Sequence, residues 1–268
     1  YFNISNFDDS SYGNFKNSNE KNTFCFFLDY LFFISWVFFY IMKKTILITG
    51  GSQRIGRSIA LFLKDSNYNF IIHYNKSSKA ARELKNIING HGRDCEIVKT
   101  DLSKISDVKD IIKRSKKFFG PIHAIVNNAS LFINDNIENL NDKLWYDHMN
   151  INLYAPLIIS KEFNKQLPKK SLGHIINILD QNVVNPDTSF FSYSISKSAL
   201  LSATTIMAKS FAPNIRVNAI GPGPTLKNIH QSKKHFDQSI KNTLLKIGSP
   251  PEEIAKTVKF LLESKSIT

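Results

Sequence analysis

The chain contains few cysteines and comparatively little acidic charge, and each shortage excludes a class of protein. Only Cys25 and Cys95 occur in 268 residues. They are too few and too far apart for a disulfide framework, which favours a reducing, cytoplasmic compartment. The seven histidines form no cluster with metal-ligand spacing, so no metal site is predicted. The net charge is +13, but the lysines are scattered and no nucleic-acid motif accompanies them. A solvated Lys-rich surface is therefore expected, and no nucleic-acid partner.

The first 41 residues lack the pattern of a folded domain. Residues 1–23 are rich in Asn and Ser without an apolar period, which is typical of disorder. Residues 24–41 are almost wholly apolar apart from Asp29 and reach the lower limit for a membrane span. A signal peptide would need a small-residue cleavage site, which this stretch does not offer. An anchor would be joined to the first core strand by residues 42–44 alone. We expect the native protein to start at Met42, with a membrane anchor as the alternative.

Short apolar runs alternate with helical patterns from residue 45 onward. This βαβ alternation predicts one Rossmann-type α/β domain, a doubly wound parallel sheet, over residues 42–268. Several runs are continuously apolar, as expected of strands that are covered on both faces. Helical segments such as Ile55–Lys64 separate them. The chain ends just after a helix where one more strand is expected, so we interpret the last strand as truncated. The predicted strands are Thr45–Thr49, Asn69–Tyr74, Asp94–Lys99, Ile122–Asn127, Gly173–Leu179 and Ile215–Ile220.

The last part of the chain contains one well-marked helix and one weakly patterned segment. Ser249 is the expected N-cap of the helix, with Pro250 in the first turn and Glu252 completing a capping box. Residues 222–248 hold Pro, Gly, His and Lys with weak periodicity. We interpret them as a mobile segment over the active site.

The run Thr49-Gly50-Gly51-Ser52-Gln53-Arg54-Ile55-Gly56 lies between the first strand and the first helix. Its glycines allow a tight turn and a close approach of the backbone to a pyrophosphate. The N-terminus of the following helix supplies free N–H groups and the positive end of a dipole. The position of the run, more than its composition, predicts a dinucleotide site.

The end of the second strand determines which dinucleotide is expected. A site for NAD places a carboxylate there for the ribose hydroxyls. The sequence His73-Tyr74-Asn75-Lys76-Ser77-Ser78 contains none. Lys76 and the serines would instead bind a 2′-phosphate, and Arg54 adds positive charge nearby. NADPH is therefore predicted rather than NADH.

The pair Tyr193/Lys197 predicts the catalytic chemistry. Nine Tyr and 29 Lys give about one chance Tyr-x-x-x-Lys match, and the chain holds three. Two of them, at Tyr12 and Tyr40, lie in the non-core segment. Tyr193/Lys197 lies in a helical pattern after the fifth strand, where the carboxyl ends of the strands form a ligand crevice.

Residues four apart share a helix face, so the lysine can act on the phenol. An ammonium about 4 Å away contributes roughly 4 kcal/mol at an effective dielectric constant of about 20, or about three pKa units. This is an upper bound for the lowering of the pKa of Tyr193, because burial opposes it. A phenol with a pKa closer to neutral would exchange its proton more readily.

From residue 42 to residue 268 the chain resembles the short-chain dehydrogenase/reductase family. Besides the turn and the Tyr/Lys pair, the resemblance extends to Asp101-Leu102, Asn127-Asn128-Ala129, Asn152 and the run from Asn218 to Gly223. It implies that Tyr193 is the proton donor and that Lys197 binds the nicotinamide ribose. It also implies that Asn152 holds a proton-relay water, that Asp101-Leu102 lie next to the adenine, and that the enzyme is a homodimer or homotetramer.

Three departures from the family pattern narrow the resemblance to the pteridine reductases. Arg54 replaces the middle glycine of the turn, Ser130 follows Asn-Asn-Ala, and Asp180 stands where the family has a serine. Phe132 matches the aromatic residue that sandwiches a pterin against nicotinamide. An ionised carboxylate cannot donate to a ketone oxygen, but it can accept from a pterin N–H group. The expected substrate is therefore a dihydropterin or related pteridine.

Together these observations predict an NADPH-dependent oxidoreductase in which Asp180 and Tyr193 deliver the proton. One alternative is a carbonyl reductase of 3-oxoacyl thioesters or sugars, and another is a non-catalytic dinucleotide-binding redox sensor. The predicted catalytic set is Tyr193, Lys197, Asp180 and Asn152. The predicted substrate contacts are Arg54, Ser130, Phe132, Asp180 and Tyr193. The predicted cofactor contacts are Gly50, Ser52, Arg54, Ile55, Gly56, Tyr74, Asn75, Lys76, Ser77, Asp101, Leu102, Asn128, Ala129, Lys197, Pro222 and Gly223.

Overall fold

The computed structural model describes residues 43–186, 188–228 and 232–268. The predictions for residues 1–41 lie outside these ranges. In the described part of the chain, no helix combines the length and the apolar character needed to cross a bilayer.

Six parallel strands form one sheet in the order β3-β2-β1-β4-β5-β6. All six predicted strands are confirmed, each with ends within two residues of the prediction. The continuous apolar runs explain this agreement, because both faces of the sheet are covered. The strands are β1 (Lys44–Ile48), β2 (Tyr68–Tyr74), β3 (Cys95–Lys99), β4 (Ala124–Asn127), β5 (Gly173–Ile178) and β6 (Ile215–Ile220).

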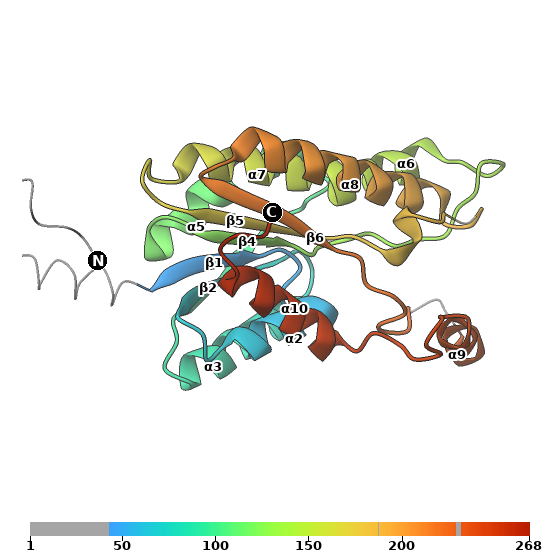
Figure 1. Cartoon of the computed structure of the whole chain (residues 1–268), viewed down its shortest axis with the longest axis horizontal. Coiled ribbons are helices and arrows are strands. Elements are labelled where there is room, and N and C mark those ends of the chain that lie inside the picture. The colour runs from blue at the N-terminus through green and yellow to red at the C-terminus, as the bar shows by residue number, and fades with distance from the viewer. Residues whose placement is uncertain (1–42, 187, 229–231) are drawn as a thin grey trace, which may run out of the picture. The chain divides into compact units, whose positions relative to one another are not determined.

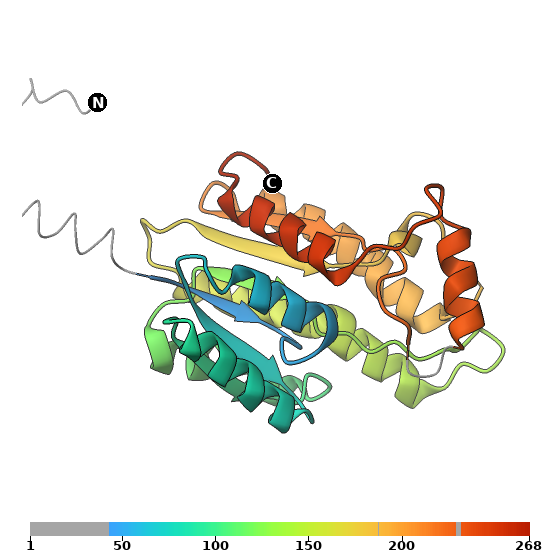
Figure 2. The same cartoon turned by 90° about the horizontal axis from the view of Figure 1, so that it is seen from below.

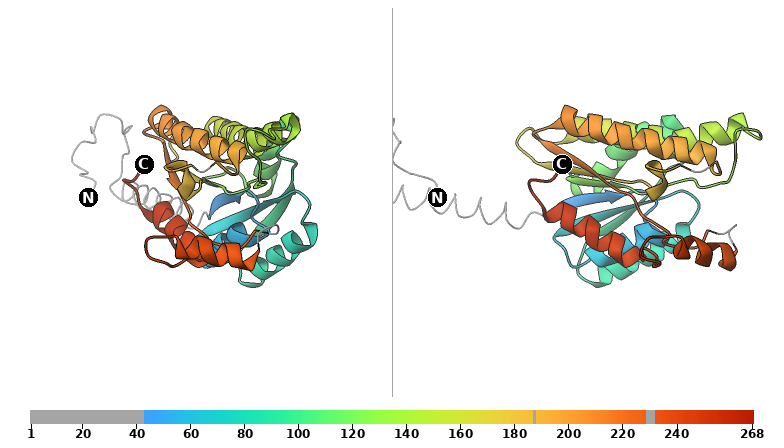
Figure 3. Two further views of the ribbon diagram at one scale, coloured as in Figure 1. Left: turned by 90° about the vertical axis from the view of Figure 1, so that its right-hand side faces the viewer. Right: turned by 45° about the vertical axis from the view of Figure 1, so that its right-hand side comes forward.

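Helices cover both faces of the sheet (Figure 1). On one face, α2 (Arg54–Leu63), α3 (Ser78–Gly90) and α10 (Pro251–Glu263) pack over a core that includes Ile46 and Ile48. On the other face, α4 (Ile105–Lys109), α5 (Ile111–Phe119), α7 (Ala155–Gln166) and α8 (Phe191–Phe211) pack over Leu47. Successive side chains of β1 thus enter opposite cores. Figures 2 and 3 show α10 beside α2, and α8 on the opposite side of the sheet.

Two shorter segments lie between β4 and α7. These are α6 (Asp142–His148), with Asn141 as its N-cap, and the π-helical turn η2 (Met149–Tyr154). A 3-10 turn, η3 (Gln181–Val183), follows β5 directly. The π-helical turn thus interrupts regular α-helix beside the predicted site. Such turns often occur at functional positions.

Of the two predictions for the last part of the chain, the mobility of residues 222–248 stays a prediction, and the capping box at Ser249 is wrong. The weakly patterned segment contains α9 (Lys233–Lys241), whose N-cap Ser232 accepts from the backbone N–H of His235. The last helix starts at Pro251 with Pro250 as its N-cap, and no capping side chain bonds to it. The backbone N–H of Ser249 donates instead to the carbonyl of Pro224. A contact 25 residues away in the sequence therefore replaces the expected capping box.

Candidate active site

An open cavity of about 1240 Å³ lies at the carboxyl ends of the strands. This is the edge where parallel α/β sheets bind their ligands. Most of the predicted residues line it, including Gly50, Ser52, Arg54, Ile55, Tyr74, Asn75, Ser77, Leu102, Asn128, Ala129, Ser130, Phe132, Asp180, Tyr193, Lys197, Pro222 and Gly223. Four described residues of the prediction do not line it: Gly56, Lys76, Asp101 and Asn152.

The glycine turn requires its glycines for steric reasons. Gly50 adopts φ 60°, in the left-handed region, and a Cβ there would lie 2.9 Å from the Cα of Ala129. A Cβ at Gly56 would lie 2.5 Å from the carbonyl oxygen of Gly50. Gly56 does not line the cavity, but its missing side chain lets the turn pack against the start of α2. No acidic residue stands in the first turn of α2, and no side chain caps it. This helix N-terminus fits a pyrophosphate.

The side chains of Thr49, just after β1, and Asn128, just after β4, hold the glycine turn in place. The hydroxyl of Thr49 donates to the carbonyl of Val126 and accepts from the backbone N–H groups of Asn128 and Ala129. The amide of Asn128 donates to the carbonyls of Thr49 and Gly50. The Asn-Asn-Ala motif thus fixes the backbone of the turn.

His73, at the end of β2, holds the turn from the side. Its Nδ1 accepts from the backbone N–H of Gly50 at 3.0 Å, and its Nε2 donates to the carbonyl of Thr100 at 3.0 Å. Burial lowers the pKa of His73 to about 4, so the ring is neutral at physiological pH. Ser52 Oγ lies 2.7 Å from Ser77 Oγ, which joins the turn to the end of β2 a second time.

Arg54 adopts φ 52°, a left-handed conformation that favours glycine. This conformation agrees with the glycine that the family pattern has at that position of the turn. Its guanidinium donates to the carbonyl oxygens of Leu226 and Lys227 at 3.0 and 3.1 Å. The arginine thus connects the phosphate turn to the segment that follows β6.

Asp101, predicted to lie next to the adenine, follows β3, and Lys76, predicted to bind the 2′-phosphate, follows β2. The carboxylate of Asp101 accepts from the backbone N–H and the hydroxyl of Ser103 and from the amide of Asn75. Burial raises the pKa of Asp101, but the two hydrogen bonds from Ser103 and the charges of Lys104 and Lys76 outweigh it, so the pKa is lowered. Lys76 is exposed. The predicted cofactor contacts of both residues stay predictions.

Asp180 and Tyr193 meet at the other end of the cavity. The phenol oxygen of Tyr193 donates to Oδ2 of Asp180 at 2.8 Å. Asp180 Oδ1 accepts from the backbone N–H of Asn182, which starts the 3-10 turn and aims the carboxylate. Burial, the charge of Asp180 and this hydrogen bond raise the pKa of Tyr193 well above its ordinary value. The lowering expected from the sequence is therefore wrong, and the phenol keeps its proton.

Lys197 lies one helical turn beyond Tyr193, with 2% of its surface exposed. Its ammonium donates to the carbonyl of Ile178 at 2.7 Å and stands 5.8 Å from the centre of the Tyr193 ring. Burial lowers the pKa of Lys197 to about 8, although the charge of Asp180 opposes this. The lysine is thus held by the end of β5 and does not contact the phenol oxygen.

Asn152 lies in the π-helical turn and is buried. Its Oδ1 accepts from the backbone N–H of Leu131 at 2.7 Å and from the hydroxyl of Ser130. Its Nδ2 donates to the carbonyl of Leu131 and to Ser196 Oγ. These bonds use both amide hydrogens and the oxygen of the side chain. Asn152 therefore organises the segment that carries Ser130, and its predicted relay of protons stays a prediction.

Phe132 forms an aromatic cluster with Tyr193. Its ring stacks on Phe190 with centroids 4.3 Å apart and meets Tyr193 edge-on at 4.6 Å. The Phe132 side chain is 38% exposed and lines the cavity, so one apolar surface is available to a flat ring. Phe190 was not singled out from the sequence, although an aromatic residue just before the Tyr193 helix was a usable signal.

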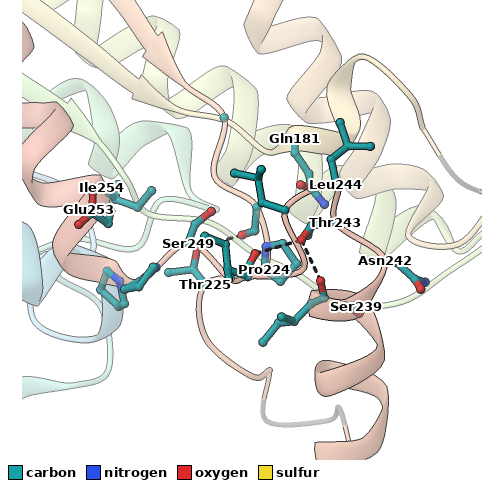
Figure 4. A pocket seen from close by; sticks show the side chains of 18 of the residues that line it. Gln181, Pro224, Thr225, Ser239, Asn242, Thr243, Leu244, Ser249, Glu253 and Ile254 are labelled. Atoms are coloured by element: carbon teal, nitrogen blue, oxygen red, sulfur yellow. Dashed lines mark hydrogen bonds between the residues drawn. The ribbon is translucent and has the colours of Figure 1, made fainter.

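A second cavity, of about 1200 Å³, lies between α9, residues 242–250 and the start of α10 (Figure 4). It is bordered by the exposed apolar side chains Leu244, Leu245 and Ile247. Six residues border both cavities: Gln181, Gly223, Pro224, Thr225, Phe236 and Ser239. Residues 223–225 therefore form a thin wall between them. The sequence did not indicate this cavity, because its lining comes from segments with weak periodicity.

The comparisons agree with this geometry. A family model described as short chain dehydrogenase matches residues 44–238. A short-chain type dehydrogenase/reductase of Picea abies is 28% identical over 230 residues, covering 81% of this chain and 85% of the relative. The 3-oxoacyl-[acyl-carrier-protein] reductase FabG of Staphylococcus epidermidis is 28% identical over 228 residues, covering 84% and 93%.

Solved structures are similar over most of the domain. FolM Alternative dihydrofolate reductase 1 from Brucella suis, in complex with NADP, is 37% identical with a TM-score of 0.81, covering 85% of this chain and 92% of that one. The Brucella canis protein of the same name, also complexed with NADP, is 36% identical with a TM-score of 0.79, covering 85% and 91%.

Proposed function

This chain belongs to the short-chain dehydrogenase family, and from that premise we propose that it is an NADPH-dependent oxidoreductase that reduces a dihydropterin or related pteridine. The observation that carries the proposal is the 2.8 Å hydrogen bond from Tyr193 to Asp180. A carboxylate at this position cannot donate to a substrate carbonyl, as a serine would. It can accept from the amino and ring N–H groups of a pterin, which favours a substrate rich in such donors.

The cofactor site fits NADPH on the chain's own features. The turn at Gly50 and Gly56 and the uncapped start of α2 suit the pyrophosphate. Ser52 and Ser77 line the cavity after β2, and we expect them to bind the 2′-phosphate together with Lys76; no carboxylate follows β2 to favour NAD. Lys197 lines the same cavity, and we expect its ammonium to bind the nicotinamide ribose. When bound, NADPH supplies the hydride.

The chain's own residues supply and hold the proton. Reduction of a C=N bond needs a hydride at carbon and a proton at nitrogen. Because burial and Asp180 raise the pKa of Tyr193, its phenol carries a proton at neutral pH. Asp180 accepts the hydrogen bond of the Tyr193 phenol and orients the substrate by accepting from the N–H groups of the pterin. Phe132 offers a flat face for the ring, and Ser130 and Arg54 are the further contacts that the pteridine reductases suggest.

The Brucella structures support this assignment, because both are called dihydrofolate reductases, enzymes whose substrate contains a pterin ring. The second candidate function is reduction of a 3-oxoacyl thioester. The Staphylococcus epidermidis relative favours it by name, at lower identity. Asp180 opposes it, because a ketone oxygen requires a donor at that position.

The proposal includes a cytoplasmic enzyme that assembles with copies of itself. Cys95 is buried, and burial is the main cause that raises the pKa of its thiol to about 12. The thiol is therefore unreactive and unsuited to disulfide formation, which agrees with a reducing compartment. Assembly is implied by membership of the family and is favoured by apolar side chains on the outside of α8, where Ile206 is 63% exposed. Light scattering of the purified protein would measure the assembly.

The testing experiment follows NADPH oxidation by the chain from Met42 onward. Substrates are dihydrobiopterin, dihydromonapterin and dihydrofolate, with acetoacetyl thioester and NADH as controls. We expect turnover with a pterin and NADPH that Tyr193→Phe lowers by about 100-fold or more. Turnover with the thioester alone would overturn the pteridine assignment and favour the second candidate.

A further inference from the structure

Residues 131–135 follow β4 along the catalytic side of the cavity, without helix or strand, between η2 on one side and the start of α8 on the other. We call them the clamp segment. It carries Phe132, whose ring meets Tyr193 edge-on. The segment therefore sets the distance between the aromatic face and the proton donor.

Two buried side chains hold the first half of the clamp segment. Asn152 bonds both the N–H and the carbonyl of Leu131. Two residues further on, the backbone N–H of Ile133 donates to Nε2 of His148 at 3.4 Å. Nδ1 of His148 donates in turn to the carbonyl of Leu144 within α6. Burial lowers the pKa of His148, which agrees with a neutral ring that accepts at Nε2.

Asp135 holds the second half of the clamp segment to α8. Its Oδ1 accepts from the backbone N–H of Ser192 at 3.0 Å, and its Oδ2 accepts from the Ser192 hydroxyl in a very short bond. Its own carbonyl accepts from the N–H of Phe191 at 3.1 Å. Asp135 is 3% exposed and Ser192 is fully buried. The carboxylate thus satisfies the N–H of Ser192, and the main-chain carbonyl that of Phe191, in the first turn of α8 at the positive end of the helix dipole.

These contacts join the two groups that the reaction must keep together. Ser192 immediately precedes Tyr193, and Phe132 lies three residues before Asp135. Phe190, the residue just before α8, stacks on Phe132 and adopts φ 56°, a left-handed conformation. The backbone N–H of Phe190 donates to Oδ1 of Asn134, so the clamp segment also holds this strained residue.

We propose that Asp135 is a positioning residue: it fixes the start of α8 to the clamp segment and so holds the Tyr193 phenol in register with the substrate-binding face of Phe132. No described group of the reaction contacts the carboxylate of Asp135, so it acts on Tyr193 through Ser192. The inference rests on the proposed function for the roles of Tyr193 and Phe132. It adds a determinant of kcat 45 residues before Asp180 in the sequence.

A helix cap without a positioning role makes a different prediction. It would lower the melting temperature and leave the turnover of each folded molecule unchanged. Positioning instead lowers kcat with little effect on cofactor binding. The phosphate turn is attached to β1, β2 and β4, and Lys197, the α8 residue that is expected to bind the nicotinamide ribose, is held by the carbonyl of Ile178 at the end of β5. Misplacement of a reacting group by about 1 Å can cost about 100-fold in rate.

The experiment measures kcat, KM and NADPH affinity for Asp135→Asn, Asp135→Ala and the control Asp107→Asn. Asp107 also accepts from a neighbouring serine hydroxyl, but on an exposed turn of α4 far from the cavity lining. We expect kcat to fall about 100-fold in Asp135→Ala, with NADPH affinity within about twofold of the wild type. Asp135→Asn keeps an oxygen for the Ser192 N–H, so its kcat should lie between those of the wild type and Asp135→Ala. The control should match the wild type.

If Asp135→Ala does not fold, Ser192→Ala replaces it, because it removes only the hydroxyl donor; its kcat should fall about tenfold. All variants are assayed with the substrate that the wild type turns over fastest. If the pteridine assignment fails, the wild type will not turn over a pterin, and the variants can still be compared with it on the substrate that it does turn over. Wild-type kcat per folded molecule in the variants, or equal losses of kcat and NADPH affinity, would overturn the proposal.

Discussion

The two ends of the cavity are built in different ways. At the cofactor end, the functional surface is backbone, held by neutral hydrogen bonds from His73 and Asn128. At the catalytic end, the functional surface is a set of ionisable side chains, Asp180, Tyr193 and Lys197, each buried or half-buried. The first end requires that nothing intrude on a tight turn. The second requires that the proton stay on the Tyr193 phenol and that the charges of Asp180 and Lys197 stay in place beside it.

This difference separates the consequences of substitution. Changes at the cofactor end act through sterics and folding, and they should appear in stability and NADPH affinity together. Changes at the catalytic end act through the proton donor, and they should appear in kcat. Variants that lower kcat without weakening NADPH, and variants that do the reverse, test whether the two ends are independent.

The largest effect is expected for Asp180→Ser, at the catalytic end. The serine removes the acceptor of the Tyr193 phenol and of the substrate N–H groups, so kcat with a pterin should fall about 100-fold to 1000-fold. NADPH affinity, measured by fluorescence titration, should stay within about twofold. Asp107→Ser is the matched control on an exposed helix. Undiminished pterin turnover in Asp180→Ser would contradict the role of the carboxylate.

At the cofactor end, the largest effect comes from protonation of His73. Its pKa is about 4 in the folded chain against an ordinary 6.5. Between these values the unfolded chain binds a proton that the folded chain does not. The contribution of His73 is therefore complete above pH 6.5 and is lost as the pH falls towards 4, by at most about 3 kcal/mol. Urea unfolding at several pH values measures this loss.

The control for that prediction is His73→Asn, which keeps an acceptor for Gly50 N–H but does not titrate. Other histidines with lowered pKa, such as His174, contribute in the same direction. The difference between wild type and variant isolates His73. If the two stability curves stay parallel from pH 7 to pH 4, His73 is not the acid-sensitive support of the turn.

A somewhat smaller effect is expected for Gly56→Ala. The added methyl would overlap the Gly50 carbonyl and the Asn128 amide, at 2.5 and 2.6 Å, so the turn must shift. We expect a loss of about 1–3 kcal/mol in the free energy of unfolding and weaker NADPH binding. Gly90→Ala is the matched control, since no atom lies within 4 Å of a Cβ there. Wild-type NADPH affinity in a folded Gly56→Ala protein would show that the turn tolerates a side chain.

The sequence predicts the cofactor end better than the catalytic end, and the reason is physical. Strands and the glycine turn depend on local patterns, so both were predictable from continuous apolar runs and spacing. The aspartate–tyrosine pair was predictable only through resemblance. The contact between Asp135 and Ser192 joins residues 57 apart and has no local signal. Helix α9 was missed because it is short and largely polar: its only apolar side chains are the pair Phe236 and Ile240, which is too weak a pattern to detect.

Raised and lowered pKa values were the hardest quantities to predict. The lowering expected for Tyr193 assumed an ammonium about 4 Å away. Instead Lys197 donates to the carbonyl of Ile178, and a carboxylate holds the phenol. The sequence contains all three residues, but only the fold determines which of them meet.

The smallest effect is expected where the two ends are connected, at Arg54. Its exposed guanidinium donates to the carbonyls of Leu226 and Lys227, so Arg54→Ala should raise KM for the pterin about tenfold with little change in kcat. Arg54→Gly removes the same bonds but suits φ 52°. The two variants should therefore share one KM, while the glycine variant melts at a higher temperature. Steady-state kinetics and thermal melts of both proteins separate the side chain from the backbone. A normal KM in both would show that the contacts of Arg54 with the segment after β6 do not contribute to substrate binding, and that the two ends are as independent there as elsewhere.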